Sequence, residues 1–269
     1  MISDTQTQIS WWGNFKLDHN QSKQWIIGPL SLIVRHLDGE WQIAYERLGD
    51  FDSDTSIVEI SDTDQLPATL GNNSRYVFRI TKGLLTVMPM LADRPIIARP
   101  QTPFNLTAGE EVTLYISSPV WIELAVGTPT AKTLESIAIQ RPSDTWFGPS
   151  TLEGELCYAS TTHCRMDFTE ICQRPHRAIT PVLIRNQADT TLAIERVKLP
   201  TPLLPVYSSS DGQLWTSKIT LVREKDGDMA ELFIDDKPPK EIENSTLLRK
   251  PRDEIDNTIL IRAFNAVFN

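Results

Sequence analysis

Residues 112–126 carry the clearest structural signal in the chain and read Val112-Thr-Leu-Tyr-Ile-Ser-Ser-Pro-Val-Trp-Ile-Glu-Leu-Ala-Val126. Apolar side chains occupy every second position from Val112 to Ile116, and a second apolar row runs from Val120 to Val126. Successive side chains of a β-strand point to opposite faces, so this two-residue period predicts two half-buried strands.

The same alternation recurs along most of the chain. It predicts further strands at residues 25–34, 41–45, 56–60, 76–80, 84–89, 155–160, 181–185, 191–198, 214–224 and 229–234. The last two segments flank Glu224-Lys-Asp-Gly-Asp228. Asp-Gly readily adopts the positive φ angles of a tight turn, so we expect these two strands to form a hairpin.

Many short strands broken by proline, asparagine and aspartate are typical of an antiparallel fold. We therefore predict an all-β protein, an antiparallel β-sandwich of jelly-roll or Greek-key type. Interruptions between residues 140 and 150 suggest two packed sandwich halves, residues 1–140 and 141–269, with one continuous domain as the alternative. At most a short helix is expected at the C-terminal end, over residues 252–268, and a strand over residues 258–262 competes with it.

Composition and charge narrow the class of protein. The chain has 26 Lys and Arg against 35 Asp and Glu, a net charge of −9, which argues against binding to nucleic acid or to an anionic membrane surface. The polar N-terminal residues do not resemble a signal peptide, and no apolar run approaches the ~20 residues that span a bilayer. Three cysteines are an odd number, which does not suit a secreted disulfide framework. We expect a cytoplasmic protein.

Several motifs that carry chemistry are missing from the sequence. It contains no phosphate-binding Gly-x-x-x-x-Gly-Lys loop, no Gly-x-Gly-x-x-Gly dinucleotide turn, no Gly-x-Ser-x-Gly nucleophile elbow and no His-Glu-x-x-His. We therefore assign no catalytic residue and no cofactor, and we expect a protein that binds rather than catalyses.

One window concentrates the groups that bind zinc. It contains Cys157, His163, Cys164, Cys172 and His176. Thiolate and imidazole are the ligands that zinc prefers, so four of these groups could close a tetrahedral site. The window lacks a Cys-x-x-Cys knuckle, and neighbours on a strand point to opposite faces. The competing interpretation is buried cysteines with incidental surface histidines.

Tryptophans supply the other candidate contacts. The chain has seven, namely Trp11, Trp12, Trp25, Trp41, Trp121, Trp146 and Trp215. Exposed aromatic faces bind sugar rings, whereas tryptophans in β-sandwiches more often fill the core. The adjacent Trp11 and Trp12 beside the polar N-terminal residues are the pair that we expect to contact a protein partner.

Three segments resemble an uncharacterised β-rich family of archaeal and bacterial proteins, a domain of unknown function. They are residues 119–126, residues 144–158 with the turn Trp146-Phe147-Gly148 and the strand around Cys157, and residues 181–186, which end at Asn186. Tyr158 stands where the family pattern has a basic residue. Family members are sometimes encoded beside small mechanosensitive channels, so the resemblance implies a soluble partner of such a channel.

The sequence therefore predicts a cytoplasmic accessory or interaction protein that docks a protein partner. The first alternative is a metal- or small-ligand-binding protein or enzyme that uses the window from Cys157 to His176. The second is a sugar-binding module.

Overall fold

A computed structural model describes residues 10–47, 57–65, 70–79, 82–127, 131–150, 152–225, 227, 229–242, 244–254 and 259–264, with only the backbone of residues 259 and 260. Strands dominate this part of the chain, and its helical segments are two single 3-10 turns, η2 (Phe168–Glu170) and η3 (Thr201–Leu203). The all-β prediction is confirmed. Within the described residues, no helix is long and apolar enough to cross a membrane.

The chain divides by contacts into two compact units. Unit 1 comprises residues 1–90, 120–141 and 174–176, and unit 2 comprises residues 91–119, 142–173 and 177–269. The chain therefore passes between the units several times. The division into halves at residues 1–140 and 141–269 stays a prediction; by contacts, residues 91–119 belong with most of the C-terminal part.

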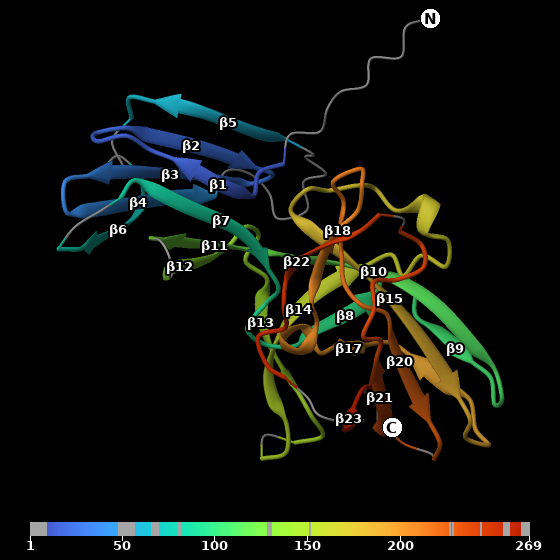
Figure 1. Ribbon diagram of the computed structural model, residues 1–269. Coiled ribbons are helices and arrows are strands. Elements are labelled where there is room, and N and C mark those ends of the chain that lie inside the picture. Colours follow the sequence, from blue (N-terminus) through green and yellow to red (C-terminus); the bar gives the residue numbers. More distant parts are fainter. Residues whose placement is uncertain are drawn as a thin grey trace, which may run out of the picture. The chain divides into compact units, whose positions relative to one another are not determined.

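Unit 1 is a sandwich of two antiparallel sheets (Figure 1). One sheet has the order β5-β2-β3-β4-β6; its strands are β2 (Ser22–Ile27), β3 (Leu30–Leu37), β4 (Glu40–Arg47), β5 (Val58–Thr63) and β6 (Asn72–Val77). The other has the order β1-β7-β11-β12; its strands are β1 (Gly13–Lys16), β7 (Leu84–Met90), β11 (Trp121–Val126) and β12 (Lys132–Ala138). Trp25 and Phe15 meet edge to face between the sheets, with ring centroids 5.2 Å apart.

Unit 2 contains a larger mixed sheet with the order β22-β18-β19-β15-β20-β21-β23, and β10 pairs with β15 as well. Its strands are β10 (Glu111–Pro119), β15 (Arg177–Asn186), β18 (Val206–Ser208), β19 (Leu214–Trp215), β20 (Ile219–Arg223), β21 (Met229–Ile234), β22 (Thr246–Arg249) and β23 (Ile259–Arg262). A four-stranded sheet, β13-β14-β8-β17, and the pair β16-β9 complete the unit. These strands are β8 (Ile96–Pro100), β9 (Phe104–Leu106), β13 (Ser143–Phe147), β14 (Glu155–Thr162), β16 (Leu192–Ile194) and β17 (Val197–Leu199).

The larger sheet divides along β15. Strand β10 pairs with β15 from Arg177 to Arg185 and so occupies one edge of it over nearly its whole length. Strands β19 and β20 must therefore share the opposite edge, where β19 pairs with residues 178–179 and β20 with residues 182–186. Two branches leave this edge, β19-β18-β22 and β20-β21-β23. We call the point of division, residues 180–181 and 216–218, the fork.

The chemistry of the fork explains why the sheet breaks there. Pro181 has no N–H to donate, and proline within sheets is found at edges and breaks. On the other side of the gap, Thr216 still donates its N–H to the carbonyl of Ile179 at 2.9 Å, whereas β20 begins only at Ile219. The fully buried hydroxyls of Thr216 and Thr180 lie 3.0 Å apart across the gap.

Several predictions about individual elements need correction. The strand predicted over residues 25–34 is the hairpin β2-β3, because Gly28 adopts a positive φ of 52° and turns the chain. Residues 259–262 form strand β23, so the competing strand is correct there and the helix is wrong; residues 255–258 and 265–269 lie outside the described part. Among the described strands, three pairs are parallel: β8 with β14, β15 with β19, and β15 with β20.

Candidate functional site

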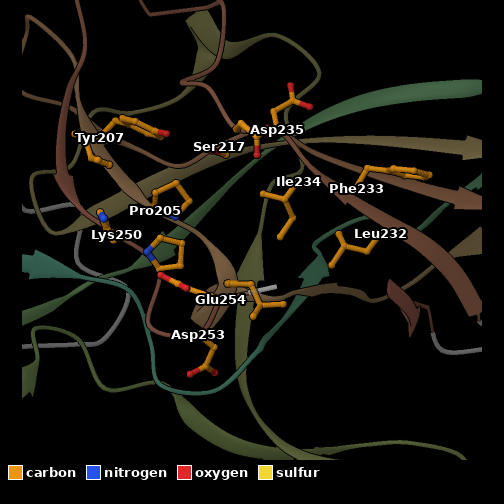
Figure 2. Close-up of a pocket in the computed structure, with 14 residues that line it drawn as sticks. Pro205, Tyr207, Ser217, Leu232, Phe233, Ile234, Asp235, Lys250, Asp253 and Glu254 are labelled. Carbon is orange, nitrogen blue, oxygen red and sulfur yellow. The ribbon is translucent and has the colours of Figure 1, made fainter. Parts of the chain in front are cut away.

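A cavity of about 610 Å³ is lined by residues from both branches of the fork (Figure 2). We call it the fork pocket. Pro205 and Tyr207 come from the β18 branch, Leu232 and Ile234 come from the β21 branch, and Ser217 lies at the fork itself. The volume is within the range of about 300–1,000 Å³ that is usual for ligand sites.

The floor of the fork pocket is largely apolar. Leu232 is 2% exposed, Pro205 is buried, and Leu203 and Ile234 are half-buried. Phe233 and Leu247 also line the cavity and remain 40% and 49% exposed, respectively. An apolar ligand group could therefore contact buried side chains at the floor and partly exposed apolar side chains at the sides of the cavity.

Charged residues surround this floor. Four exposed carboxylates line the pocket, those of Asp235, Asp236, Asp253 and Glu254, and Lys250 is the one cation among the described lining residues. Figure 2 shows Asp253 and Glu254 at one end of the cavity and Asp235 at the other. The lining carries a formal charge of −3 from four acids and one base, so it favours cationic over anionic ligands.

Two hydroxyl groups also line the pocket. Ser217 is fully buried, and its Oγ donates to the carbonyl of Lys237 at 3.4 Å. Tyr207 is 7% exposed as a whole residue, and its hydroxyl makes no hydrogen bond to another described residue. A hydroxyl both donates and accepts, so Tyr207 offers a hydrogen-bonding group to whatever occupies the cavity.

The lining residues contain neither cysteine nor histidine as far as the structure describes them. Throughout the described part of the chain, no three His, Cys, Asp or Glu side chains are grouped so that they could hold a metal ion.

The predicted zinc window is dispersed over different environments. Cys157 is fully buried in a small core with Ile97 and Phe147, whereas His163 and Cys172 are exposed. Cys164 is buried and adopts a positive φ of 46°. His176 is 1% exposed and belongs to unit 1, whereas the other four belong to unit 2. Zinc binding stays a prediction, and metal analysis of the purified protein tests it.

Burial also determines the chemistry of the two buried thiols. It raises the pKa of Cys157 to about 12, with a smaller contribution from the nearby Glu155 carboxylate. Burial raises the pKa of Cys164 to about 11. Because the thiolate is the nucleophile and the metal ligand, both groups are unreactive near neutral pH.

The two N-terminal tryptophans lie in different environments. Trp11 is fully buried, and its indole N–H donates to the carbonyl of Pro175 at 2.9 Å. Trp12 is half-buried and packs edge to face on Trp11, with ring centroids 5.3 Å apart. Trp11 is therefore part of the core of unit 1, and of the pair only Trp12 presents a surface to a partner.

The remaining tryptophans bear on the sugar-binding alternative. Trp25, Trp41, Trp121 and Trp215 are at most 6% exposed, and Trp146 is 45% exposed. No tryptophan is among the described residues of the fork pocket. Sugar binding by this pocket would depend on Tyr207 and Phe233 instead.

Sequence reasoning did not identify the fork pocket. Its residues are distributed between positions 203 and 254 and become neighbours only through the branching of the sheet. Two local signals were present: the acidic pair Asp235-Asp236 directly after a strand, and Pro181 inside an apolar strand. Neither signal specifies a pocket by itself.

Comparison with known proteins gives one match. Residues 11–269 match the model of the family described as "Protein of unknown function (DUF432)". No curated protein and no solved structure matches the chain.

Proposed function

The chain belongs to the DUF432 family, and we propose that it is a cytoplasmic accessory protein that docks a protein partner through the fork pocket. The observation that carries the proposal is the pocket lining. It combines a largely buried apolar floor with four exposed carboxylates. Such a lining recognises an apolar and cationic segment.

A membrane channel of the small mechanosensitive type is the partner that the family resemblance suggests. Cytoplasmic segments of membrane proteins carry an excess of lysine and arginine. A chain with a net charge of −9 complements such segments, and long-range attraction would accelerate their encounter.

Affinity capture from detergent-solubilised cells tests the docking proposal. We expect the full-length tagged protein to retain one reproducible partner, identified by mass spectrometry. The variant Asp235→Asn/Asp236→Asn should lose most of that partner, because it removes two of the four carboxylates. The control Asp38→Asn/Glu59→Gln changes the net charge equally on exposed residues of unit 1 and should retain it. Capture that is equal for all three proteins would contradict docking at this pocket.

Trp12 is tested separately, because removal of residues 1–12 would also delete the buried Trp11. If Trp12 contacts the partner, Trp12→Ala should weaken capture while the melting temperature of the protein changes little. Capture at the wild-type level would remove Trp12 from the contact surface.

A further inference from the structure

We infer that the fork pocket recognises one lysine or arginine side chain, flanked by an apolar residue, in a segment of a protein partner. The inference rests on the proposed docking function and specifies the chemistry of the occupant. Three independent features of the pocket support it: its floor, the hydroxyl of Tyr207 and its charge.

The floor suits the stem of a long basic side chain. Lysine and arginine pack their methylene groups along apolar surfaces while their charged ends remain in a polar environment. Leu232 and Ile234 face Pro205 and Tyr207 across the cavity (Figure 2). The exposed Phe233 and Leu247 offer contact to the flanking apolar residue.

The Tyr207 hydroxyl can bond to an occupant that carries a hydrogen-bond donor or acceptor. Tyr207 is 7% exposed and its hydroxyl has no hydrogen bond to another described residue. Figure 2 shows this hydroxyl turned towards Ser217, which lines the same cavity. A tyrosine hydroxyl accepts hydrogen bonds, so a ligand that supplies an N–H donor can bond to this oxygen.

Charge determines which donor fits. The four carboxylates exceed Lys250 by three negative charges, so a phosphate or carboxylate group would be repelled. An ammonium or guanidinium group is attracted by the carboxylates and can also donate to the Tyr207 oxygen. A neutral sugar would satisfy the hydroxyl but gain nothing from the carboxylates.

Two matched peptides test this inference on the full-length protein. The first is acetyl-Leu-Lys-Leu-amide, and the second replaces lysine with norleucine, which has a similar stem but no charge. We expect the lysine peptide to shift NMR signals of the residues that line the pocket in a saturable way. The norleucine peptide should bind at least tenfold more weakly, and raising the salt concentration should weaken only the lysine peptide.

Pocket variants locate the binding. Tyr207→Phe removes only the hydroxyl and should weaken the lysine peptide about threefold to tenfold, the effect of one hydrogen bond. Asp235→Asn/Asp236→Asn should weaken it by about tenfold, from two exposed charge contacts. The control Asp38→Asn/Glu59→Gln should leave the affinity unchanged.

The outcomes separate this inference from the docking proposal. Equal binding of both peptides, or no saturable binding of either, overturns the recognition of a basic side chain. If affinity capture still depends on Asp235 and Asp236 in that case, docking stands with a different occupant. If the lysine peptide binds and no partner is captured, the pocket chemistry stands and the docking proposal fails.

Discussion

Gly28 is a residue at which both backbone conformation and space demand glycine. Its φ is 52°, and an added Cβ would lie 2.5 Å from Nδ1 of the buried His176. Gly109 has a similar φ of 78°, but an added Cβ would meet nothing within 4 Å. Gly109→Ala should therefore lower the free energy of unfolding by only about 1–2 kcal/mol, the cost of a left-handed conformation at a residue other than glycine.

We predict that Gly28→Ala is the more destabilising variant of this pair. The collision with His176 should add about 1–3 kcal/mol, the usual cost of overpacking. Chemical denaturation of both variants measures the difference. Equal losses would show that the imidazole moves aside at no cost.

The three thiols should differ sharply in reactivity. Cys172 is exposed, whereas burial raises the pKa of Cys157 to about 12 and of Cys164 to about 11. At pH 8 we predict one fast-reacting thiol in a native Ellman titration and three after denaturation. Cys172→Ser should abolish the fast phase. Rapid labelling that persists in this variant would contradict the burial of the other two.

The same pKa shifts predict a dependence of stability on pH. An unfolded cysteine ionises near its ordinary pKa of 9.0, whereas these thiols stay neutral in the fold to higher pH. Burial of the neutral thiols therefore stabilises fully below pH 9, and this contribution is lost as the pH rises towards 11–12. Chemical denaturation between pH 8 and 11 measures this effect. The free energy of unfolding should fall more steeply with pH for the wild type than for Cys157→Ala.

At the scale of elements, the fork is held by a pair of buried hydroxyls. Thr216 and Thr180 are both fully buried, and their Oγ1 atoms lie 3.0 Å apart. Thr216→Val should lower the free energy of unfolding by about 1–3 kcal/mol, because the buried Thr180 hydroxyl loses this partner. Thr180→Val should cost less, about 1 kcal/mol, because Thr216 still donates to the carbonyl of Ser217 at 3.0 Å. The double variant should cost at least about 0.5 kcal/mol less than the sum of the two. Additive losses in urea denaturation would show that the pair does not couple the branches.

At the scale of the whole molecule, we predict that neither residues 1–140 nor residues 141–269 fold alone. The first fragment carries β10 without β15, with which it pairs from Glu111 to Pro119. The second fragment lacks β8, β9 and β10 of unit 2, and unit 1 would lose residues 174–176. Circular dichroism melts of each fragment should lack a cooperative transition, and the full chain is the control. A cooperative melt of residues 1–140 would contradict this prediction and support a boundary near residue 140.

Local signals in the sequence predicted most strands because alternation needs only neighbouring residues. The hairpin β20-β21 was predicted from Asp226-Gly227, and its antiparallel pairing is confirmed, although Asp226 and Asp228 lie outside the described residues. The same alternation failed to indicate that β11 is buried on both faces, including Glu123 at 7% exposure. Burial of the second face depends on what packs there, which neighbouring residues do not specify.

The sequence by itself determined the all-β class, most strand positions and the net charge of −9, since each follows from composition or from a two-residue period. Only the tertiary structure decided that Trp11 is core, that the cysteine and histidine window is dispersed and that a pocket exists at the fork. The physical reason is that the residues that come together in these features are far apart in the sequence. Leu203 and Glu254 line one cavity because β19 and β20 both pair with the same edge of β15. This pairing joins residues that are far apart in the sequence.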